Sequence, residues 1–182
     1  MQSALALWRT NGYAKTTVAD ICRAAGVSKA LFYFYFPRKE DVLFEVGVLS
    51  TDAAHERARA AMRESSDIAT VVQAMLASLE ATMRTSTPEL VLEAVIEGYR
   101  QSAAGEDHLE RTSVVFAEVF EQARRGGTLP TDFDVEHVAV VAQSLVSEGA
   151  RYWAMGAYGD RSFADVVGRD IVALVNGHAA NR

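Results

Sequence analysis

Apolar residues recur every three or four positions along most of the chain, which is the spacing of one face of an α-helix. The longest such stretch predicts a helix from Lys39 to Glu64, with Val42, Val46, Leu49 and Ala53 along one side. No segment shows apolar and polar residues alternating between two turns, as a strand would. The pattern therefore predicts an all-α fold.

The same spacing continues after a break at residues 65–67, where Asp67 can cap the next helix. Gly126, Gly127 and Pro130 mark the clearest loop. The further predicted helices, with their inward residues, are 68–86 (Ile68, Val72, Met75, Leu79, Met83), 88–104 (Leu92, Val95, Ile96, Tyr99), His108–Arg125 (Phe116, Val119, Phe120, Ala123), Asp134–Met155 and Phe163–His178.

The stretch from Thr16 to Glu40 has the pattern of a helix-turn-helix. Thr17 is a plausible N-cap of a short first helix, and Gly26 ends that helix where a left-handed conformation is needed. Ser28 can cap a second helix two residues later. A short turn between two such helices is the geometry that places the second helix in the major groove of DNA.

The second helix of this motif divides into two faces. Phe32 and Phe36 are four residues apart and suit an inner face together with Val27. The opposite face carries a cation, a methyl group and a phenol that suit contacts with base edges: Lys29, Ala30 and Tyr33. Residues suited to backbone phosphates follow: Tyr35, Arg38 and Lys39.

These residues resemble the helix-turn-helix of TetR-family transcriptional regulators. The resemblance covers roughly the first fifty residues, and beyond them only the length and helical layout are similar. It implies that Lys29, Ala30 and Tyr33 face base edges, with Ser28 beginning the recognition helix, and that Thr17, Tyr35 and Lys39 face phosphates. The matching positions are Thr17, Ile21, Ala25 to Ser28, Tyr33, Phe36, Lys39 and Glu40.

Some positions depart from the family pattern. Ala30 replaces a common glycine, Leu31 a frequent Thr or Ser, and Cys22 a usual alanine. Leu31 removes a polar base contact but keeps the option of a thymine methyl contact. Family members usually carry a basic stretch ahead of the first helix, which here includes Leu5 and Trp8. Either DNA affinity rests on fewer charges or the chain begins late.

The charge distribution predicts two domains. The net charge of −6 argues against a nucleic-acid binder. However, residues 1–48 carry six Lys/Arg and four Asp/Glu, and the remainder carries an excess of acids. This distribution agrees with a DNA-binding domain at 1–48, and the resemblance implies a ligand-binding and dimerisation domain at 49–182, whose acidity would orient the basic end towards DNA.

The sequence offers little support for catalysis, a metal or a cofactor. The four histidines are scattered, and no phosphate loop, dinucleotide-binding glycine pattern or Ser nucleophile motif is present. The single cysteine, Cys22, follows an apolar stripe and suits a small core residue better than a redox sensor. Without a membrane-spanning run or a signal-peptide pattern, we expect a cytoplasmic protein.

The body suggests a pocket for a partly apolar small molecule. Methionines and aromatic residues suit its walls, although the same helical stripes are also what a plain core requires. Candidate polar contacts include Glu97 and Glu148. The ligand-binding candidates are Met75, Met83, Tyr99, Phe116, Phe120 and Gln143.

The last two predicted helices carry more apolar surface than a small body needs. TetR-like proteins dimerise through two such helices, so the resemblance implies a homodimer; a core within one chain is the alternative. The residues concerned are Val138, Val141, Leu145 and Val146 with Val166, Val167, Ile171 and Leu174, and Gly149 and Ala150 allow close helix approach.

The hypothesis that follows is a homodimeric repressor that binds a near-palindromic operator in double-stranded DNA. A small-molecule inducer in the body would move the long connecting helix and disfavour the DNA-bound state. The main alternative is a protein-interaction module that has a DNA-binding head but no small-molecule pocket. A helical enzyme that retains the helix-turn-helix is a further alternative.

Overall fold

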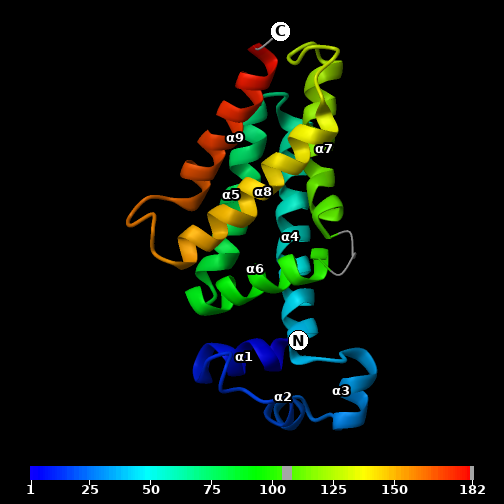
Figure 1. Cartoon of the computed structure of the whole chain (residues 1–182), viewed down its shortest axis with the longest axis vertical. Helices are drawn as coiled ribbons and strands as arrows, with labels where there is room; N and C mark the ends of the chain where they lie inside the picture. The colour runs from blue at the N-terminus through cyan, green and yellow to red at the C-terminus, as the bar shows by residue number, and fades with distance from the viewer. Residues whose placement is uncertain (104–107, 181–182) are drawn as a thin grey trace.

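The computed structural model describes residues 1–103 and 108–180, and throughout them the only regular elements are helices. A three-helix head lies below a larger helical body (Figure 1). The helices are α1 (Gln2–Asn11), α2 (Val18–Ala25), α3 (Lys29–Tyr35), α4 (Lys39–Glu64), α5 (Ile68–Arg84), α6 (Pro88–Ala103), α7 (His108–Arg125), α8 (Val135–Ala154) and α9 (Phe163–Ala180). The all-α prediction is confirmed.

Local capping fixes the two helices of the helix-turn-helix. The Thr17 hydroxyl accepts a hydrogen bond from the backbone N–H of Asp20, and the Asp20 carboxylate accepts one from the backbone N–H of Thr17. This reciprocal arrangement satisfies two free donors at the start of α2. Gly26 ends α2 in the left-handed conformation, with φ of 68°. The Ser28 hydroxyl then caps α3 by accepting from the backbone N–H of Leu31.

The core of the head is completed by a residue of the body. Trp8 of α1, Phe32 of α3 and Leu43 of α4 are buried together, and Leu90 of α6 is buried in the same cluster. Cys22 is also buried here, as predicted. The head therefore packs on the lower helix of the body as well as on the long helix α4 (Figure 1).

The body is a bundle in which α8 packs between α7 and α9, while α5 packs against α4 and α9. Gly149 allows α8 to approach α9 closely. A Cβ atom at this position would overlap Cγ2 of Val167, so the close approach expected from the sequence occurs within one chain. Phe116 and Phe120 of α7 are fully buried in this core.

Several predicted inward positions are wrong because one helix contacts different partners along its length. On α4, Leu49 is 51% exposed and Ala53 is exposed, while Ala54 and Ala58 are buried in the body. On α6, Tyr99 is 44% exposed. Neither helix presents a single apolar stripe to a single partner.

In the turn of the helix-turn-helix, Val27 is exposed and does not join Phe32 in the head core. Phe36, by contrast, packs against that core as predicted.

Within the described residues, none of the helices combines the length and the apolar character required to span a membrane.

Candidate nucleic-acid interface and ligand pocket

Helix α3 presents an exposed face that begins at Ser28. Lys29 and Ala30 are exposed, and Tyr33 is 51% exposed. Phe32 points the other way and is buried, which anchors the helix on the head core. Its ring contacts that of Tyr33 edge-on, with 5.5 Å between the centroids. The structure thus brings the predicted base-facing residues together on one exposed helix face.

Helix α3 also exposes two apolar side chains, Leu31, which the sequence analysis considered only for a thymine methyl contact, and Phe34, which it did not consider. Phe34 is 78% exposed and Leu31 is 45% exposed. Phe34 contacts the ring of the exposed Tyr35 edge-on. An isolated short helix rarely exposes such residues without a partner surface. The unbroken apolar and aromatic run from Leu31 to Phe36 was the sequence signal that could have identified them, because one short helix cannot bury all of these side chains on a single face.

Two cations expected at phosphates have partners within the protein. The Lys39 ammonium donates to the backbone carbonyls of Tyr13 (3.0 Å) and Thr16 (3.2 Å), and lies 4.1 Å from the centroid of the Tyr13 ring. The Arg38 guanidinium pairs with Asp41 and with Glu97. These cations therefore fix the junction between the head and α4 in this structure.

The hydroxyls of Thr17 and Ser28 are engaged in capping. Thr17 remains exposed at the start of α2 and also donates to the Asp20 carboxylate at 2.6 Å. These hydrogen bonds, and to a lesser extent the Arg23 side chain, hold the pKa of Asp20 below its ordinary value. A capped helix start also leaves further backbone N–H groups directed outward, which suits an anion.

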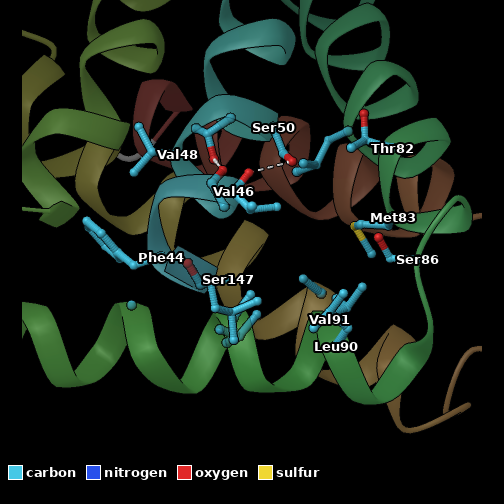
Figure 2. A pocket seen from close by; sticks show the side chains of 18 of the residues that line it. Phe44, Val46, Val48, Ser50, Thr82, Met83, Ser86, Leu90, Val91 and Ser147 are labelled. Carbon is cyan, nitrogen blue, oxygen red and sulfur yellow. Dashed lines mark hydrogen bonds between the residues drawn. The ribbon is translucent and has the colours of Figure 1, made fainter. Parts of the chain in front are cut away.

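A pocket opens in the body between α4, α5, α6 and α8. It has an empty volume of about 1030 Å³, part of it open to solvent. Figure 2 shows Phe44, Val46, Met83, Leu90 and Val91 around it, with Ser147 from α8. Across the described residues, no Asp, Glu, Lys, Arg or His lines this pocket. Its polar groups are hydroxyls, backbone groups and one amide.

The two hydroxyls that α4 contributes to the pocket already donate hydrogen bonds to carbonyl groups of the same helix. Ser50 donates to the backbone carbonyl of Val46 at 2.9 Å, and Thr51 donates to that of Gly47 at 3.0 Å (Figure 2 for Ser50). Such side chains can still accept a hydrogen bond from a ligand. The pocket therefore has a mostly apolar, uncharged lining with a few hydrogen-bonding groups.

The predicted ligand-binding residues divide into two sets. Met83, Tyr99 and Gln143 line the pocket. Met75, Phe116 and Phe120 do not, because they are buried in the body core, so their interpretation as core residues was the right one.

Of the three predicted polar contacts, Gln143 lines the pocket, whereas the two carboxylates do not. The carboxylate of Glu97 lies on the Arg38 guanidinium, and that of Glu148 pairs with Arg151. Side-chain size explains what the sequence analysis missed. The pocket exists where small residues of three helices meet, at Gly47, Ala94, Gly98 and Ala150.

The predicted dimer helices are partly used within the chain. Val138, Val146, Val167 and Ile171 are buried in the core of the body itself. Val141, Leu145, Val166 and Leu174 are half-buried, and Val140, Tyr152 and Met155 are exposed on or just after α8.

The described residues include no group of three His, Cys, Asp or Glu that could hold a metal ion.

Comparison with known proteins agrees with this geometry. Residues 1–46 match the family model described as bacterial regulatory proteins, tetR family. The same region is 41% identical over 46 residues to the HTH-type transcriptional regulator EthR of Mycolicibacterium smegmatis. That match covers 25% of this chain and 21% of EthR. This match lies within the head.

The fold of the whole chain is similar to solved TetR-type structures. FadR of Thermus thermophilus, a transcriptional repressor solved in complex with lauroyl-CoA, superposes with a TM-score of 0.78 at 23% identity, over 100% of this chain and 93% of that one. FadR of Bacillus subtilis, solved with stearoyl-CoA, gives 0.72 at 17% identity, over 97% and 96%.

The head defines a helix-turn-helix DNA-binding protein with an appended helical body. Residues 1–46 belong to the tetR family of bacterial regulatory proteins, and the fold of the whole chain is similar to that of solved TetR-family structures.

Proposed function

We propose that this protein is a dimeric, sequence-specific transcriptional repressor that is released from its operator by an apolar ligand. The observation that carries the proposal is the continuous path from α3 through the single helix α4 to the wall of an apolar pocket. The exposed residues of α3 would read base edges in the major groove, and the capped start of α2 would face a phosphate. The sign of regulation depends on where the operator lies relative to the promoter.

The pocket lining indicates the class of ligand. A lining without charged side chains disfavours an ionic group and favours a long or bulky apolar one. The two FadR structures were solved with lauroyl-CoA and stearoyl-CoA. We therefore propose a ligand whose apolar part is of the fatty acyl kind. The charged end of an acyl-CoA would have to lie outside the lining residues.

The pocket also bears on the alternative of a protein-interaction module. That alternative expects a body without a cavity and with a large exposed apolar patch. The body has a pocket between its helices, which favours the small-molecule reading.

A two-fold dimer through α8 and α9 would complete the proposal. The half-buried apolar residues and the exposed Val140 and Tyr152 supply the surface for it. Such a dimer would place two recognition helices about 34 Å apart, or a multiple of that, for two half-sites of DNA.

The decisive experiment is selection of genomic fragments on the purified protein, followed by footprinting at a stated salt concentration. We expect a protected near-palindrome with two half-sites. Lauroyl-CoA is then added as the probe, and we expect it to weaken binding to the selected fragment. Binding that is weak, independent of sequence and abolished by salt would contradict the proposal, since it is the behaviour of non-specific phosphate contacts alone.

A further inference from the structure

A single layer of side chains separates the pocket from the core of the head. Leu43 of α4 and Leu90 of α6 are buried in the head core beside Trp8, and both also line the pocket. Ala94 packs against the head core and lines the pocket as well. The pocket and the head core therefore share a wall, and whether a change in the pocket reaches the head depends on how firmly α6 is joined to the head.

A charged contact joins the same two parts. Arg38 is the N-cap of α4 and is separated from the end of α3 by two residues. Its Nη2 atom lies 2.9 Å from Oε1 of Glu97, a carboxylate on α6 that is only 1% exposed. The next two residues of α6, Gly98 and Tyr99, line the pocket. The pair thus runs from the pocket wall to the end of the recognition helix.

The Glu97 carboxylate is fixed on α6 by its own neighbours. The Gln101 amide donates to Oε1 at 2.8 Å, and Arg100 lies 3.3 Å from Oε2. The carboxylate therefore moves with α6. Arg38 is in turn fixed to α4 through Asp41, which accepts its Nη2–H at 2.6 Å.

We propose that α6 transmits occupancy of the pocket to the DNA-binding head through the Glu97–Arg38 ion pair, with Glu97 as a positioning residue. The inference rests on the proposed function, because it assigns the coupling between the pocket and the DNA site.

The physical basis is the difference between the two kinds of contact. An occupant that pushes α6 away from α4 can slide the apolar contacts of Leu90 and Ala94, which have no preferred direction. Separation from Arg38 would leave the buried Glu97 carboxylate with only Gln101 and Arg100 of its own helix, and loss of a charged partner at a buried site is costly, so Arg38 and the adjoining end of α3 should follow α6. The head is thereby shifted relative to its operator-binding position.

A built-in occupant of the pocket tests this without knowledge of the natural ligand. Val95 is half-buried, lines the pocket from α6 and lies outside the head core, so Val95→Phe places a larger side chain at the α6 wall of the pocket. Glu97→Gln removes the charge, keeps an acceptor for Gln101 and leaves Arg38 paired with Asp41. Both variants are made singly and together.

The matched control breaks an ion pair that does not reach the head. Arg59 of α4 and Glu118 of α7 form a pair with 2.8 Å between Nε and Oε2. Glu118→Gln removes the same charge as Glu97→Gln and also one contact of α4.

We measure the Kd for the selected operator fragment in each background. Allosteric coupling typically changes affinity by about 5- to 150-fold. We therefore expect Val95→Phe to raise the Kd for the operator at least about 5-fold in the wild-type background, where the Glu97–Arg38 pair is intact, and also in the Glu118→Gln background. In the Glu97→Gln background, Val95→Phe should raise this Kd by less than about twofold. Addition of lauroyl-CoA as the probe should raise the Kd in the same backgrounds as Val95→Phe does. An equal rise in Glu97→Gln, or no rise in any background, would overturn the proposal.

A second readout needs neither DNA nor ligand. The chain has two tryptophans, Trp8 in the head core and Trp153 in the body, so Trp153→Phe leaves Trp8 as a reporter of the head. Val95→Phe should change acrylamide quenching of Trp8 only where Glu97 is present; unchanged quenching contradicts the coupling.

If Val95→Phe does not fold, Ser147→Leu places a larger side chain in the pocket from α8. Wild-type protein that selects no DNA would refute the proposed function, while this readout still tests the coupling.

Discussion

Tyr33 combines an exposed ring and hydroxyl with a rigid position, because it is flanked by the buried Phe32 on α3. We predict that Tyr33→Ala weakens binding to the selected operator by about 1–3 kcal/mol, as loss of a base contact would. Binding to random DNA and the oligomeric state should be unchanged. Fluorescence anisotropy with both DNAs checks this, and equal losses on both would make Tyr33 a phosphate contact.

Lys29→Ala is measured in parallel with Tyr33→Ala, on the operator and on random DNA. If the ammonium contacts a phosphate, binding should weaken to a similar extent on all sequences, and the slope of log Kd against log salt should fall by about one. A loss confined to the operator would instead assign Lys29 to a base edge.

Residues that act through their immediate neighbours in sequence were predicted well. Thr17, Gly26 and Ser28 have roles that depend on a few adjacent backbone groups, so their identity and spacing suffice. Arg38 and Lys39 show the limit of that reasoning. Their partners, Glu97 and the carbonyls of Tyr13 and Thr16, come from distant parts of the chain, which local patterns do not reveal.

At the scale of the elements, the contact of α8 with α9 depends on Gly149. We predict that Gly149→Ala destabilises the fold by about 1–3 kcal/mol, because the new methyl group would overlap the side chain of Val167. Gly177→Ala on α9 is the matched control, since a Cβ there meets nothing within 4 Å. Urea denaturation compares the two, and equal effects would exclude the overlap as the cause.

The start of α9 depends on a carboxylate from α5. Burial raises the pKa of Glu80, but hydrogen bonds from the backbone N–H of Ala164, the Ser162 hydroxyl and Arg84 outweigh it and hold the pKa below the ordinary 4.5. Because the folded-state pKa is lowered, this stabilisation is complete above about pH 4.5 and is lost as the pH falls through the folded value.

Glu80→Gln should therefore lower the free energy of unfolding by about 1–3 kcal/mol at pH 7. The difference from the wild type should shrink as the pH is lowered below 4.5. Urea titrations at several pH values measure it, and a difference independent of pH would mean that the charge of Glu80 contributes little.

Helix boundaries could be read from the sequence more reliably than helix faces. The predicted bounds of α4 and α7 agree with the structure. The predicted face of α4 failed because this helix contacts the head at Val42 and Leu43, the pocket at Val46, and the body at Ala54 and Ala58. The pocket was harder to predict than the helices. It forms where side chains are small, whereas the sequence analysis searched for large apolar residues.

At the scale of the whole molecule, the proposed dimer has a direct test. Light scattering at micromolar concentration should give a mass near twice 19.8 kDa. Tyr33→Ala should leave this mass unchanged, because α3 lies in the head, far along the chain from α8 and α9. A monomeric mass would require the two half-sites of the operator to be bound without a preformed dimer.

The burial of Leu90 in the head core has a consequence for protein engineering. Regulators of this kind invite chimeras in which the DNA-binding part of one is fused to the sensing part of another. A junction placed at residue 48 would cut the head from Leu90 and from the partner of Arg38, and leave Trp8 and Leu43 beside unmatched surface. A working chimera should transplant residues 88–101 of α6 together with the head, or redesign the recipient helix to supply a leucine and a carboxylate at the positions of Leu90 and Glu97.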